Sequence, residues 1–145
     1  MPAILMMIAL LLGPGQPSAV QAAAKYLPDV TWRPASVLIA DFSCHGRTEQ
    51  ALLGVTQSEL VIAVFLNGLG RQPEVLRYSA KVRDPKLAKL TVESLDYDPR
   101  APLGQDLPGF RRSPTCKGLN LSDGLIDSAH IYWNHDTKRF DDWVL

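Results

Sequence analysis

Leu60-Val-Ile-Ala-Val-Phe-Leu66 is apolar at every position. Successive side chains of a β-strand point to opposite faces of its sheet, so a strand that is apolar throughout needs cover on both faces. We therefore expect this segment to be a central strand of its sheet, with packed layers on both sides.

The segments on either side of this run also have strand patterns. Val37–Ala40 and Gln50–Val55 are short apolar runs bounded by polar residues and glycine. Val75–Val82 alternates apolar and polar side chains, which predicts a strand with one wet face. In Leu90–Tyr97 the apolar positions change from even to odd numbers near Ser94, which predicts a β-bulge or a bend there.

The remaining segments are turns, one helical stretch and a terminal hairpin. Asp84–Leu90 starts with an N-cap aspartate followed by proline, which favours one or two helical turns. Asp98–Pro114 is rich in proline and predicts a long irregular connection. The pair Asp123-Gly124 favours a tight hairpin turn before Leu125-Ile126, and Ala129–Val144 has the pattern of a second hairpin.

These patterns predict an all-β domain of about seven or eight short antiparallel strands with one short helix. We expect a single small domain over residues 25–145. The predicted core consists of Val37, Ile39, Leu52, Val61 to Phe65, Leu76, Tyr78, Val92, Ile131 and Trp133.

The first 24 residues have the features of a secretory signal peptide. Ala3–Leu12 is an apolar run, and small residues follow it up to Ala22 and Ala24, after either of which we expect cleavage. The run is shorter than the about 20 residues that span a bilayer, so we expect no membrane association after cleavage. This predicts a periplasmic or secreted protein.

The composition narrows the classes of partner. Fifteen Lys and Arg balance fifteen Asp and Glu, which argues against unspecific binding of nucleic acid or anionic membranes.

The chain has two cysteines, Cys44 and Cys116, which in an exported protein favour one disulfide bond. Closing a loop of about 73 residues is worth roughly 4 kcal/mol. The alternative, Cys44 as a catalytic thiol or metal ligand, lacks a Cys-x-x-Cys partner.

One stretch has the spacing of a calcium loop. Asp41, Ser43, His45 and Glu49 occupy positions 1, 3, 5 and 9 of the frame, and Gly46 occupies the position of the sharp turn. With its flanking strands, the segment from about 37 to 75 resembles a single FG-GAP or VCBS-type repeat.

The resemblance implies a strand-loop-strand unit with a degenerate metal site. Ser43 and His45 are poor calcium ligands, so any calcium binding would be weak, and we expect no other cofactor. The alternative is a structural turn in which Asp41 hydrogen-bonds the loop backbone and Cys44 anchors the disulfide. Leu95–Pro99 and His130–His135 also resemble segments of an exported bacterial family that carries no known activity.

The C-terminal hairpin contains the remaining candidates. His130, Tyr132 and Asn134 share one face of a strand, so they could form a polar binding surface, or merely a solvated one. The candidate binding residues are Phe110, His130, Tyr132, Asn134 and His135. A zinc site from His45, His130 and His135 lacks supporting spacing, and the carboxylates of Glu93, Asp96 and Asp98 lack an identifiable catalytic partner.

Two functions follow from these patterns. The preferred one is a small exported, monomeric and non-enzymatic binding domain, such as an inhibitor or immunity-type partner of another envelope or secreted protein. The alternative is a metal-dependent or hydrolytic envelope enzyme that uses the C-terminal His and Asp residues.

Overall fold

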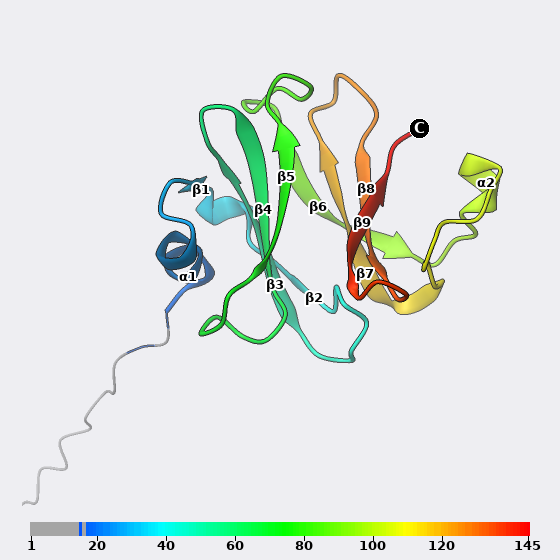
Figure 1. Ribbon diagram of the computed structural model, residues 1–145, viewed down its shortest axis with the longest axis horizontal. Coiled ribbons are helices and arrows are strands. Elements are labelled where there is room, and N and C mark those ends of the chain that lie inside the picture. The colour runs from blue at the N-terminus through cyan, green and yellow to red at the C-terminus, as the bar shows by residue number, and fades with distance from the viewer. Residues whose placement is uncertain (1–14, 16) are drawn as a thin grey trace, which may run out of the picture.

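The chain forms two antiparallel β-sheets and two short α-helices (Figure 1), in a computed structural model that describes residue 15 and residues 17–145. Sheet A has five strands, β1 (Thr31–Trp32), β2 (Leu38–Ala40), β3 (Glu49–Val55), β4 (Glu59–Phe65) and β5 (Glu74–Ser79). Sheet B has four, β6 (Lys89–Leu95), β7 (Ser113–Ser122), β8 (Ala129–Asn134) and β9 (Arg139–Trp143). The helices are α1 (Ala19–Tyr26) and α2 (Arg100–Leu103), and Pro34–Ser36 forms a 3₁₀ helix. The predicted all-β class is confirmed.

β4 lies between β3 and β5, and both of its faces are buried, as predicted. Leu60, Ile62 and Val64 face sheet B, where they join the core between the sheets. Val61, Ala63 and Phe65 face the other way, where they pack beneath α1. The uniformly apolar sequence of β4 is therefore explained by two separate apolar layers.

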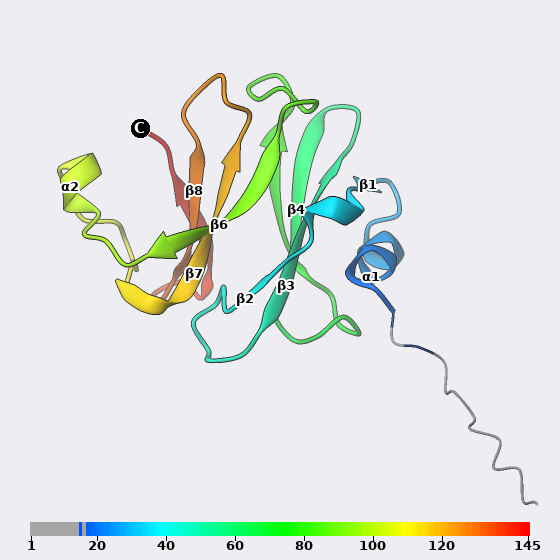
Figure 2. The same ribbon diagram turned by 180° about the vertical axis from the view of Figure 1, so that it is seen from behind.

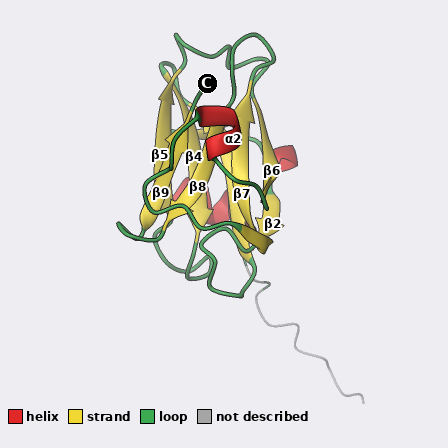
Figure 3. Ribbon diagram, turned by 90° about the vertical axis from the view of Figure 1, so that its right-hand side faces the viewer, coloured by secondary structure: helices red, strands yellow, loops and turns green. Residues whose placement is uncertain are grey.

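The main core fills the space between the two sheets, which stack face to face (Figure 3). Sheet A contributes alternate residues of β3 and β4, and sheet B contributes alternate residues of its strands. The buried members are Phe42, Ala51, Leu53, Leu60, Ile62, Val64, Ala88, Leu90, Leu119, Leu121, Ala129 and Ile131.

Each sheet also carries a cover on its outer face. Figure 1 shows α1 beyond sheet A and the connection that contains α2 beyond sheet B, on opposite sides of the molecule. Figure 2 shows the same arrangement from behind. The connection that contains α2 runs from β6 to β7. The register between these two strands shifts between Ser94 and Leu95. The irregularity predicted near Ser94 is therefore present, but the pairing passes from Lys117 to Ser113, so the additional residues lie on β7.

Two residues assigned to the core are exposed. Ile39 is 64% exposed, because its neighbours Leu38 and Ala40 pack against the core and Ile39 points the other way on the three-residue strand β2. Val92 is 41% exposed. It lies on the edge strand β6, opposite Leu119 of β7 and two residues before the register shift.

Several local predictions also need correction. The nine described strands exceed the expected seven or eight, in part because the two-residue strand β1 carries too short a pattern to be recognised. Asp84–Leu90 forms one turn, within the expected one or two, in which the amides of Leu87 and Ala88 donate to the Asp84 carbonyl, but this turn is too short to form a helix. Leu125 and Ile126 lie in the β7–β8 loop instead of a strand, because the Asp123 carboxylate accepts hydrogen bonds from their amides.

The structure describes only part of the predicted signal segment. Residues 1–14 and 16 of the predicted signal segment lie outside the described residues, whereas Ala19–Tyr26 forms α1. Signal cleavage therefore stays a prediction. Within residues 15 and 17–145, no helix is long and apolar enough to cross a membrane.

Candidate functional site

The loop between β2 and β3 is held by its own carboxylates. Both oxygens of Asp41 accept backbone hydrogen bonds, from His45 at 3.0 Å and from Gly46 at 2.8 Å. Gly46 has a φ of 75° and Cys44 a φ of 59°, so the chain turns sharply here in the left-handed region. These are the hydrogen bonds that the structural interpretation of the loop predicts.

Glu49 is a buried carboxylate, 2% exposed, that is also used inside the loop. One oxygen accepts the amides of Phe42 and Ser43 at 2.8 Å, and the other accepts the Ser43 hydroxyl at 2.6 Å. The same hydroxyl lies 2.6 Å from His45 Nδ1. Ser43, Glu49 and His45 thus form one hydrogen-bonded group inside the loop.

The predicted disulfide joins Cys44 to Cys116 and so ties this loop to β7 of sheet B. A backbone hydrogen bond of 2.8 Å from the Lys117 amide to the Asp41 carbonyl lies beside it. Both cysteines pack into an apolar cluster on the outer face of sheet B. The other members of this cluster are Leu95, Tyr97, Leu107, Phe110, Tyr132 and Trp143.

The connection from residue 96 to residue 112 is fastened over this cluster. The Tyr132 hydroxyl donates to the Pro108 carbonyl at 2.8 Å, and the His135 amide donates to the Gly109 carbonyl at 2.9 Å. Gly109 has a φ of 65°, and a side chain there would collide with the amide group of Asn134. We call residues 96–112 the covering loop.

The covering loop encloses a surface hollow of about 460 Å³. Tyr97 and Phe110, whose ring centroids are 5.1 Å apart, provide aromatic surface, and two arginines and two aspartates provide charge. The hollow is lined by Tyr97, Asp98, Pro99, Arg100, Asp106, Leu107, Phe110 and Arg112. We call this the aromatic hollow.

Ion pairs order the charged side of the aromatic hollow. Arg100 Nε lies 3.3 Å from a carboxylate oxygen of Asp98 and 3.3 Å from one of Asp106, and Arg112 Nε lies 2.7 Å from Asp96. The pKa of Asp98 lies below its usual value, because its carboxylate accepts a hydrogen bond from the Arg100 backbone amide and, with a smaller effect, one from the Arg100 side chain. Because all of these side chains are largely exposed, they stay accessible to a partner and add little to stability.

A second polar group lies on the same outer face, next to the aromatic hollow. Glu93 Oε1 is 2.6 Å from His130 Nδ1, and the His130 ring stacks on the indole of Trp143 with a centroid distance of 3.9 Å. The Trp143 indole N–H donates to the Tyr97 hydroxyl at 3.2 Å, and Tyr97 lines the hollow. A carboxylate that fixes one imidazole nitrogen leaves the other nitrogen as the reactive one.

The structure places the five predicted binding residues in different roles. Phe110 lines the aromatic hollow, and His130 belongs to the neighbouring polar group. Tyr132 and Asn134 are buried beneath the covering loop, and the His135 backbone helps to fasten it. Burial, with smaller contributions from Asp141 and Asp142, raises the pKa of Tyr132 to about 12, and burial lowers the pKa of His135.

The residues considered for metal and hydrolytic sites are not gathered into one place. Among residues 15 and 17–145, no group of three or more His, Cys, Asp or Glu side chains is arranged to hold a metal ion. His45 packs edge-on against Trp133, with 5.9 Å between the ring centroids, whereas His130 stacks on Trp143. Glu93 pairs with His130, while Asp96 and Asp98 pair with arginines of the covering loop.

The sequence patterns missed three members of this surface, Tyr97, Arg100 and Asp106. The loop that carries them has no regular period, so its pattern gives no sign of their position.

No family model matches the chain, and neither a curated protein nor a solved structure matches it at a significant level. The FG-GAP-like resemblance therefore stays a prediction.

Proposed function

We propose that this chain is a small extracytoplasmic binding protein that recognises another envelope or secreted protein through the aromatic hollow and the adjoining His130 group. The observation that carries the proposal is the attachment of the covering loop to the terminal hairpin through Tyr132–Pro108 and His135–Gly109. Such attachment presents a binding surface whose shape is set before the partner arrives, which reduces the entropy lost on binding.

The chemistry of the surface suits protein recognition. Tyr and Arg are enriched among the residues that dominate protein–protein binding, and the hollow combines both with a Phe ring. Arg100 and Arg112 could exchange their exposed aspartate partners for carboxylates of a bound protein. The disulfide supports an oxidising compartment, where an inhibitor or immunity-type protein of this size would act.

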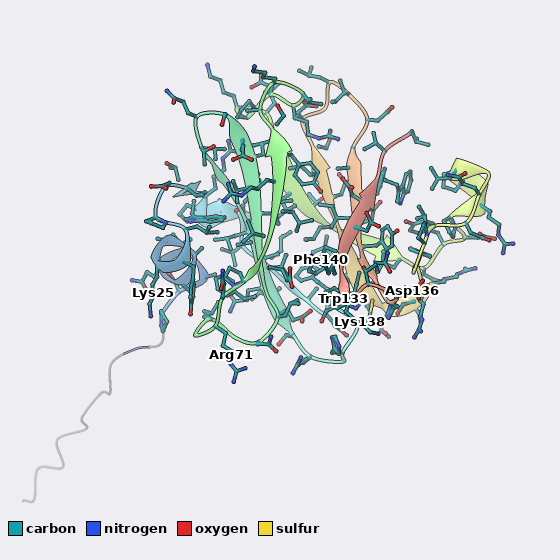
Figure 4. The ribbon with its side chains drawn as sticks, in the orientation of Figure 1. Lys25, Arg71, Trp133, Asp136, Lys138 and Phe140 are labelled. Carbon is teal, nitrogen blue, oxygen red and sulfur yellow. A yellow bond between two sulfur atoms is a disulfide. The ribbon has the colours of Figure 1, made fainter. Side chains whose placement is uncertain are left out.

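An affinity capture with a matched control tests the proposal. The tagged protein is used on the envelope fraction of its source cells, beside the double variant Arg100→Ala/Arg112→Ala. The control is Lys25→Ala/Arg71→Ala, which removes the same charge from exposed positions on the sheet A side (Figure 4). We expect a reproducible partner that the first variant loses and the control retains. Equal capture by both variants, or no partner, would contradict the proposal.

The Glu93–His130 pair favours a second candidate, a hydrolase that uses His130 as general base. A carboxylate 2.6 Å from one imidazole nitrogen orients the ring, and the other nitrogen could accept a proton from water. Incubation of the protein and of His130→Ala with envelope polymers separates the candidates. Turnover by the wild type that the variant abolishes would favour the enzyme, whereas absence of turnover by the wild type, with capture weakened in His130→Ala, would favour recognition.

A further inference from the structure

α1 is an integral part of the folded domain. Ala22 and Ala23 are 3% and 0% exposed, and they pack against the outer face of sheet A. The Tyr26 hydroxyl donates to the Gly70 carbonyl at 2.8 Å, which fixes the end of the helix to the β4–β5 connection. Cleavage after Ala22 or Ala24 would cut through this packed element.

The start of α1 is also specified by the chain before Ala22. The Ser18 hydroxyl accepts the Gln21 amide at 3.1 Å, and the Gln21 side chain accepts the Ser18 amide at 2.9 Å. This reciprocal pair is a capping box, which satisfies two backbone donors at the helix N-terminus. Both hydrogen bonds require residue 18 to stay in the protein.

The surface beneath α1 needs its cover. Leu52, Val61, Ala63 and Phe65 are at most 2% exposed and form an apolar layer with the helix alanines. A product that begins at Ala23 or Lys25 would turn much of this layer toward water, which is unfavourable in proportion to the apolar area exposed.

The residues in front of the helix have the opposite character. Gly15, Pro17 and Ser18 are exposed, and a Cβ added to Gly15 would have no neighbouring atom within 4 Å. In the sequence, Gly13-Pro14-Gly15 directly follows the apolar run. It places small residues at the first and third positions before the Gly15–Gln16 bond, which is the small-residue pattern of a signal cleavage site.

We propose that the chain is processed by hydrolysis of the Gly15–Gln16 peptide bond and that the mature protein retains the whole of α1. One water molecule is consumed, which leaves a carboxylate on Gly15 and an amino group on Gln16. The proposal rests on the export assumed under the proposed function, and it replaces cleavage after Ala22 or Ala24.

Expression of the full chain with its own N-terminus in a bacterium that has a periplasm tests the site. Intact mass and N-terminal sequencing of the periplasmic protein are expected to show a product that begins at Gln16. A product that begins at Ala23 or Lys25, or one that keeps Met1, would overturn the proposal. An exported product with another start contradicts only the processing site, whereas retention in the cytoplasm also contradicts the proposed function.

Two matched variants locate the bond without relying on the wild-type product alone. Gly15→Arg places a large charged residue directly before the bond, so we expect loss of the processed form. Ala24→Arg makes the same change at an exposed position of α1, so we expect unchanged processing. Loss of processing in Ala24→Arg but not in Gly15→Arg would place the cleavage after Ala24 and overturn the proposal.

Discussion

The outer faces of the two sheets are covered in different ways. On sheet A, α1 contributes alanines to an apolar contact, in which even the buried indole N–H of Trp32 has no hydrogen-bond partner among the described residues. On sheet B, the covering loop is held by hydrogen bonds and aromatic contacts over a cluster that contains the disulfide, and it leaves charged groups exposed to solvent. The first cover completes an apolar layer, and the second carries the surface that we propose for recognition.

The largest expected effect is the removal of the sheet A cover. A chain that begins at Lys25 should lose more stability than a single core truncation such as Phe65→Ala, which costs about 3–5 kcal/mol. Domains of this size hold only about 5–15 kcal/mol, so the shortened chain should be largely unfolded at 37 °C. Melting followed by circular dichroism, with the chain that begins at Gln16 as control, measures this. Equal melting temperatures would show that α1 is dispensable.

The next effect concerns the disulfide beneath the sheet B cover. Cys44→Ala/Cys116→Ala should lower the free energy of unfolding by about 4 kcal/mol, because the bond closes a long loop in the unfolded chain. Urea unfolding measures the change, and the reduced wild-type protein should match the variant. A loss below about 1 kcal/mol would mean that the disulfide contributes less than the chain-entropy account of its long loop predicts.

Tyr132→Phe removes one fastening of the covering loop at a smaller cost. The lost hydrogen bond to Pro108 should reduce stability by about 0.5–1.5 kcal/mol at neutral pH. Hydrogen exchange should localise the added opening to the covering loop, with α1 unchanged. Faster exchange in α1 instead would show that the two covers are not independent.

The same residue predicts a pH dependence. Folding raises the pKa of Tyr132 from 10.0 to about 12, so the folded state favours the neutral phenol. Its contribution is present below pH 10 and is lost as the pH rises through about 12. The free energy of unfolding of Tyr132→Phe should therefore fall less over this pH range than that of the wild type. Part of the fall should remain in the variant, because burial also raises the pKa of Tyr78 and of Tyr97. Identical pH profiles would contradict this account.

The smallest expected effect concerns calcium at the Asp41 loop. Both carboxylates of the loop already accept hydrogen bonds from its own groups, so the fold does not need a cation there. Thermal melts in millimolar calcium and in chelator should coincide, since a ligand stabilises a protein only if it binds the folded state. A shift of several degrees would make Asp41 and Glu49 charged ligands of a working site.

The sequence patterns predicted the elements whose signal lies in their own residues. β4 is apolar throughout because two layers bury it, and the change of phase near Ser94 marks the register shift. The pattern could not show that Ile39 points away from the core, because this depends on how the short strand β2 pairs.

The two covers were harder to predict, for separate reasons. Ala19–Tyr26 is rich in small residues, which also occur before signal cleavage sites, although Ser18 and Gln21 carry the capping-box signal of a helix. The charged side of the aromatic hollow depends on ion pairs across an irregular loop, such as Arg100 with Asp106, and no periodic pattern encodes these pairs.

Site-specific photo-cross-linking tests most directly whether a partner binds the outer face of sheet B and not that of sheet A, which α1 covers. A photoreactive residue is placed either at Asp106, at the aromatic hollow, or at Ala24, on the exposed side of α1. After irradiation of the protein with the envelope fraction, we expect a discrete adduct from position 106 and none from position 24. The same adduct from both positions, or an adduct from position 24 alone, would contradict the account.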